Sequence, residues 1–175
     1  MAMSPRALIE FWRERIVAIV LGQLAQGVTP QKVALSIALG ISLGVIPVLG
    51  TTTALCAIAA IRLKLNQPII QFVNWLVYPL QLALILVFVR IGEWMTHAPQ
   101  AVFTFPELIK LFHESPLKFV QEFGICQLQG LIAWLFIAPI FTAILFFTLI
   151  PPLKQIQHIH GLAQKAFQKK IDPGQ

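Results

Sequence analysis

The sequence predicts an all-α, polytopic membrane protein with a broken, re-entrant helical hairpin, an N-terminal amphipathic helix and about two full membrane spans. Of its 175 residues, 57% are hydrophobic and 11% are charged, whereas soluble domains contain about 25% charged residues. Three apolar blocks exceed the roughly 18 residues that indicate a membrane-spanning helix. These blocks are Val33–Ile61, Leu65–Val89 and Gly124–Leu153. We therefore expect one membrane domain over residues 29–153, without a separate soluble enzyme.

The first block contains a break near its middle. No charged side chain occurs in the 29 residues between Lys32 and Arg62. A straight helix of that length would extend about 44 Å, whereas the hydrocarbon core of a bilayer is about 30 Å thick. Gly44, Pro47 and Gly50 interrupt the block. Residues 33–61 are therefore predicted to form two short helices that enter the membrane and return to the same side.

Small residues form two lines on the first arm of this hairpin. Ala34, Ala38 and Ser42 recur every fourth residue, and Gly40 and Gly44 form a second line. Small side chains at this spacing let two helices approach closely in lipid.

Helix-start signals divide the chain further. Thr29-Pro30 is typical of an N-cap followed by proline in the first turn, and Asn66-Gln67-Pro68 repeats that pattern. The hydroxyls of Thr51–Thr53 are expected to cap the second arm of the hairpin.

Residues 1–28 are predicted to form an amphipathic helix, because apolar residues recur there at spacings of three and four. Such a helix with Trp and Phe on its apolar side can lie in the membrane interface. Packing against the rest of the domain is an equally good interpretation of the same stripe.

The second and third blocks are each expected to cross the membrane. Tyr78-Pro79 interrupts residues 65–89, which fit either one kinked span or a second broken hairpin. Residues 90–122 are predicted to form a polar loop. The span over residues 124–153 is expected to end at Pro151-Pro152, because proline cannot continue a helix, and a basic cytoplasmic tail follows over residues 154–175.

The distribution of charge predicts the topology. If the first block returns to its starting side, ten of the 13 basic residues lie in the cytoplasm. Only Arg90, Lys110 and Lys118 then lie outside, in a loop with four acidic residues. If the first block crosses instead, six basic residues lie outside and seven inside. The positive-inside rule favours the first arrangement, with both termini in the cytoplasm.

A spaced pattern of small residues, prolines and asparagines extends over Thr29–Pro99. Its members are Thr29-Pro30, Ala34, Ala38, Gly40, Gly44, Pro47, Gly50, Leu65-Asn66-Gln67-Pro68, Asn74, Pro79 and Arg90-Ile91-Gly92. By this pattern the chain resembles the bacterial membrane family catalogued as domain of unknown function 2062. The resemblance implies this fold and a location in the bacterial inner membrane, and the family has no established activity. The chain departs from the family's Asn-Pro-x-Thr element, with Tyr78 before Pro79 and Gln81 in the Thr position.

The hairpin break is also the candidate substrate site. Free helix N-termini carry partial positive charge and bind anions, and transporters place substrate sites at broken helices. The candidate substrate-binding residues are Thr51, Thr52, Asn74, Gln81 and Arg90. The candidate structural residues are Gly40, Gly44, Pro47, Gly50, Asn66 and Pro79. The alternatives are that the threonines only cap a helix, that the amides only join helices, and that Arg90 pairs with Glu93.

These residues suit an anionic head group. The first hypothesis is therefore binding, and in its stronger form translocation, of an anionic lipid or a polyprenyl-phosphate carrier. The alternatives are a non-transporting scaffold or partner of another membrane protein, and a small-solute or ion channel. A homo-oligomer is expected for a transporter or channel. No catalytic motif, cofactor site or metal site is predicted, and the basic residues are better explained by membrane topology than by nucleic acid.

Overall fold

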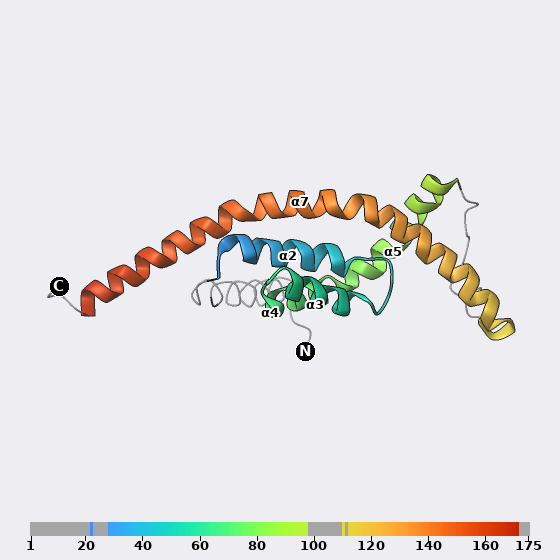
Figure 1. The fold of residues 1–175 in the computed structure, drawn as a ribbon, viewed down its shortest axis with the longest axis horizontal. Coiled ribbons are helices and arrows are strands. Elements are labelled where there is room, and N and C mark those ends of the chain that lie inside the picture. The colour runs from blue at the N-terminus through green and yellow to red at the C-terminus, as the bar shows by residue number, and fades with distance from the viewer. Residues whose placement is uncertain (1–21, 23–27, 98–109, 111, 172–175) are drawn as a thin grey trace, which may run out of the picture.

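The computed structural model describes residue 22, residues 28–97, residue 110 and residues 112–171, and the secondary structure in this part of the chain is helical. Its helices are α2 (Pro30–Gly44), α3 (Thr52–Arg62), α4 (Gln67–Leu76), α5 (Tyr78–Thr96) and α7 (Pro116–Ile171) (Figure 1). The all-α class is thus confirmed. The amphipathic helix predicted in residues 1–28 lies almost entirely outside the described residues.

Helix α7 is the longest element and lies along both α2 and α5 (Figure 1). Among the described residues, two segments are long and apolar enough to cross a membrane, Tyr78–Thr96 and Pro116–Ile159. The sequence predicted two spans at about these places. The second apolar block, however, is divided between α4 and α5, so its span-length helix begins at Tyr78.

The expectation that Pro151-Pro152 ends the third apolar helix is wrong. Helix α7 continues through this pair, as it does through Pro139. Proline removes backbone hydrogen bonds and bends a helix, and tertiary packing can compensate for that loss. Leu153, directly after the pair, is buried against Val33 and Ala34 of α2. This packing holds the helix across the prolines.

The break predicted in the first block is present. Helix α2 ends at Gly44, residues 45–51 form a turn, and α3 begins at Thr52. Gly50 has φ +82°, a left-handed conformation that glycine adopts without steric cost. The backbone after Gly44 therefore leaves α2 and reverses into α3 (Figure 1).

Helices α2 and α4 run parallel at a constant register of 30 residues. The Asn66 backbone N–H donates to Ser36 Oγ at 3.2 Å, and a Cβ atom added at Gly40 would lie 3.0 Å from the Ile70 carbonyl oxygen. Helix α3 packs against both of them, because Cys56 and Ala60 contact Ile70 of α4 and leucines of α2.

The two lines of small residues contact different helices. Gly40 and Gly44 face α4, where an added Cβ at Gly44 would lie 2.5 Å from a methyl carbon of Val77. Ala34 and Ser42 of the other line face α7, through Leu153 and Thr142 respectively. Each line therefore permits one close approach of α2 to a neighbour.

Helices α4 and α5 meet at a kink rather than a reversal. Pro79 lacks an N–H group, and its ring crowds the preceding turn, so regular helix stops at Val77. Beyond the kink the chain continues in the same direction along α7. Ile69 packs in one cluster with Leu153, whereas Phe88 packs farther along with Ala133.

Asn66 starts α4 as the sequence predicts. Its Oδ1 accepts from the Ile69 backbone N–H at 3.1 Å, and Pro68 lies in the first turn. Thr29 takes the N-cap position of α2 with Pro30 first in the helix, although within the described residues its side chain makes no capping bond.

Candidate functional site

The polar residues predicted around the hairpin break act mainly on the protein itself. Gln81 is fully buried, and its Nε2 donates to the Ile46 carbonyl oxygen at 2.8 Å. Asn74 is 3% exposed, and its Nδ2 donates to Thr53 Oγ1 at 3.4 Å. Buried backbone outside regular helix needs such partners. Gln81 therefore ties the break to α5, and Asn74 ties the first turn of α3 to α4.

The threonines do not form the expected cap. Thr51 Oγ1 donates to the Val48 carbonyl oxygen at 3.0 Å, and in the described structure its side chain makes no capping bond to α3. Thr52 is buried in the first turn of α3. Thr53, by contrast, accepts from two side chains of α4, because Gln71 Nε2 donates to its carbonyl oxygen at 3.0 Å. Gln71 was not among the residues predicted for the site.

Three side-chain amide oxygens are buried close to the hairpin. Among the residues that the structure describes, Gln71 Oε1, Asn74 Oδ1 and Gln81 Oε1 are buried without a hydrogen-bond partner. A carboxamide oxygen only accepts hydrogen bonds and carries partial negative charge. None of these contacts tests the phosphate site predicted at this break, which stays a prediction.

Arg90 lies apart from the other predicted residues. It is nine residues beyond Gln81 on the same helix, a distance of about 13 Å along the axis. Its guanidinium donates to Glu93 Oε2 at 3.0 Å, and Glu93 is buried. The structure thus brings Asn74 to Thr53 and Gln81 to the break, and it leaves Arg90 paired elsewhere.

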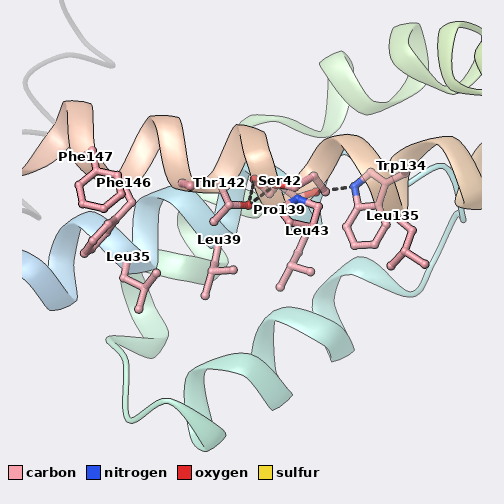
Figure 2. Close-up of a pocket in the computed structure, with 12 residues that line it drawn as sticks. Leu35, Leu39, Ser42, Leu43, Trp134, Leu135, Pro139, Thr142, Phe146 and Phe147 are labelled. Atoms are coloured by element: carbon pink, nitrogen blue, oxygen red, sulfur yellow. Dashed lines mark hydrogen bonds between the residues drawn. The ribbon is translucent and has the colours of Figure 1, made fainter.

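A second candidate site lies between α2 and α7. It is an open groove of about 370 Å³ lined almost wholly by apolar side chains. Figure 2 shows that the leucines of α2 and the aromatic side chains of α7 project to the same side of these two helices, where they line the groove. The lining residues are Leu35, Leu39, Ser42, Leu43, Trp134, Leu135, Ala138, Pro139, Thr142, Ala143, Phe146 and Phe147. This volume lies within the range of about 300–1,000 Å³ that is usual for small-molecule sites.

The polar atoms beside the groove bind one another. The hydroxyls of Ser42 and Thr142 are 2.7 Å apart, and Trp134 Nε1 donates to the Ser42 carbonyl oxygen at 2.9 Å (Figure 2). The Thr142 hydroxyl also lies 2.6 Å from the Ala138 carbonyl oxygen. These bonds leave the groove with an apolar surface that suits a hydrocarbon chain.

Sequence reasoning missed this groove. Ser42 was predicted only as a small packing residue, and no groove residue of α7 was predicted to bind a ligand. The available signal was the spacing of Trp134, Ala138 and Thr142, which recur every fourth residue and therefore share one face of a helix.

Comparison with known proteins gives the family. The family model of DUF2062, described as uncharacterized protein conserved in bacteria, matches residues 15–160. The chain belongs to this family. No curated protein and no solved structure matched it. The resemblance predicted from the Gly/Pro pattern is thus confirmed, and DUF2062 membership brings no known activity with it.

The outer faces of this DUF2062 chain are strongly apolar. Trp75, Leu86 and Trp94 are 72%, 69% and 79% exposed, and Ile61 on α3 is 73% exposed. Large contiguous apolar surfaces are unfavourable in water and mark contact with membrane or protein. Together with the two span-length helices, they favour a membrane around this part of the molecule.

Proposed function

We propose that this protein is an integral membrane protein that binds the hydrocarbon chain of a lipid in the groove between α2 and α7. The observation that carries the proposal is the groove itself, with its leucine and aromatic lining and its open side. The exposed apolar faces around it support a lipid environment.

The proposed arrangement places α5 and α7 across a bacterial inner membrane, with α2 and α3 as the re-entrant hairpin. The supporting observation is that α2 begins near Lys32 and the antiparallel α3 ends at Arg62. The start of α2 and the end of α3 therefore lie at the same end of the helical bundle. Both termini are then cytoplasmic under the positive-inside rule.

Translocation of the lipid, or of a polyprenyl phosphate, is the second step of this proposal. Its support is the broken hairpin, whose turn at residues 45–51 would end inside the membrane. A non-catalytic homo-oligomer is the form that we propose for this step, because one hairpin and two spans are too few to enclose a pathway.

A scaffold role is the second candidate function, favoured by the exposed Ile58 and Ile61 of α3.

The binding step can be tested with a phospholipid that carries a photoactivatable diazirine in its acyl chain. Cross-linking to the purified protein in lipid nanodiscs should concentrate at groove residues such as Leu39 and Phe147. Ala143→Phe should reduce these adducts severalfold, because Ala143 is an exposed residue of the groove wall. The matched control is Ala83→Phe, an equally exposed position on α5.

Adducts distributed evenly over the exposed faces of α5 and α7, with no effect of Ala143→Phe, would show ordinary annular lipid. That result would refute the groove as a binding site. The search would then turn to protein partners of the exposed α3 face.

A further inference from the structure

Basic side chains from three parts of the chain gather at one end of the helical bundle. Lys32 precedes the first core residue of α2, Arg62 and Lys64 close α3, and Lys154 follows the proline pair of α7. All four are exposed. They are separated by up to 122 positions in the sequence, so only the fold brings them to the same end.

The packing of their neighbours establishes this convergence. Val33 and Leu153, which directly follow and precede Lys32 and Lys154, are buried in the same core cluster. Ile69 of α4 belongs to that cluster as well. The N-terminal end of α2, the start of α4 and this part of α7 therefore meet.

A hydrogen-bonded chain ties the α3–α4 junction to the same place. Ser36 Oγ donates to the Lys32 carbonyl oxygen at 2.7 Å, and it accepts from the Asn66 backbone N–H at 3.2 Å. Lys64 is two residues before Asn66 and has φ 52°. The basic side chains of the junction thus lie near the start of α2.

The described acidic side chains lie at the other end. Glu93 is near the C-terminal end of α5, and Glu114 precedes α7, where Lys110 pairs with it at 3.7 Å. Along α7, Pro116 is 38 residues from Lys154, about 57 Å in a regular helix. Figure 1 shows these segments at opposite ends of the bundle. Among the described residues, the basic end, defined by Lys32, Arg62, Lys64 and Lys154, therefore carries positive charge without acidic side chains beside it.

The groove leads toward this basic end. Leu35, which lines the groove, is one helical turn from Lys32, and Phe147 is seven residues from Lys154. Because α2 and α7 run antiparallel, Leu35 and Phe147 lie at the same end of the groove (Figure 2). A chain bound there would leave its polar end beside the lysines.

We infer that the occupant of the groove is a lipid with an anionic phosphate head group, with its hydrocarbon chain along α2 and α7 and its phosphate at the basic end. This inference rests on the proposed function and adds the substrate class and its orientation. Lysine and arginine attract the anionic lipids of a cytoplasmic leaflet. The phosphate site thus lies far from Arg90, where the sequence placed part of it.

Trp134 supplies a reporter, because it lines the groove. The full chain, with Trp12, Trp75 and Trp94 replaced by Phe, is titrated in mild detergent with brominated-chain phosphatidylglycerol or phosphatidylcholine. The two lipids carry identical acyl chains, so a difference in saturable quenching reports the head group. We expect tighter binding of the anionic lipid.

Lys32→Gln with Lys154→Gln should weaken binding of phosphatidylglycerol by about fivefold for each lysine removed. Binding of phosphatidylcholine should stay unchanged, which also shows that the variant is folded. The matched control, Lys110→Gln with Lys118→Gln, removes two exposed lysines at the opposite end and should keep the preference. Salt should reduce the preference in the parent protein through screening.

The outcomes separate the two proposals. Equal affinity for both lipids, or a preference that survives the loss of Lys32 and Lys154, overturns the phosphate assignment and leaves the groove intact. Absence of saturable quenching by either lipid contradicts the groove itself. If inorganic phosphate at the same concentration as the lipid abolished the quenching, the site would bind the free anion, and the assignment of a lipid would be refuted.

Discussion

Gly92 of α5 lies directly against the backbone of Gln129 of α7. A Cβ atom at Gly92 would overlap the carbonyl carbon and oxygen of Gln129 and would lie 3.1 Å from its Cα. A backbone cannot move aside as a flexible side chain can. The closest approach of the two span-length helices therefore depends on this glycine.

Gly92→Ala should lower the stability of the folded protein by about 1–3 kcal/mol, because the methyl group forces α5 and α7 apart. Thermal unfolding in detergent, followed by circular dichroism, measures the change. Gly124→Ala is the control, since an added Cβ there meets nothing within 4 Å. It should stabilise α7 by up to about 1 kcal/mol. Equal effects of the two substitutions would contradict the close contact.

Gln81→Met should destabilise the protein by about 1–3 kcal/mol, because it preserves the volume of the side chain and leaves the buried Ile46 carbonyl oxygen without its donor. Chemical denaturation in mixed micelles measures this loss. Gln155→Met, at an exposed position of α7, should be nearly neutral. A neutral Gln81→Met would mean that the hairpin turn does not depend on this bond.

Arg90→Gln should destabilise the protein because it leaves the buried Glu93 carboxylate without its ionic partner. Adding Glu93→Gln removes that buried charge, so the double variant should be more stable than Arg90→Gln alone. A double-mutant cycle on unfolding free energies measures the coupling. Additive losses would show that the two side chains act independently.

Cysteine labelling tests the proposed topology of the hairpin. In a background with Cys56 and Cys126 replaced by Ala, Lys64→Cys should resist a membrane-impermeant maleimide added outside intact spheroplasts. Lys118→Cys should react under the same conditions, and both should react after lysis. External labelling of Lys64→Cys would mean that the first apolar block crosses the membrane completely.

Several features of the fold follow from local interactions and could be predicted from the sequence. The apolar blocks predicted the helices, and Gly50 and Pro47 predicted the turn between α2 and α3, because backbone conformation and the missing proline N–H act within a few residues. The Asn66 cap is equally local. For the same reason the sequence could predict two lines of small residues, but not which helix each line contacts.

The partners of these elements depend on long-range packing, which local sequence patterns do not specify. Ser42 and Thr142 are 100 residues apart in sequence, and Gln81 and Ile46 are 35 apart. Helical periodicity shows which side chains share a face, and it does not show which face of another helix packs against them. The burial of Leu153 likewise carried α7 through two prolines that local rules treat as an end. The groove and the basic end exist because helix packing, a long-range interaction, joins segments that local sequence cannot connect.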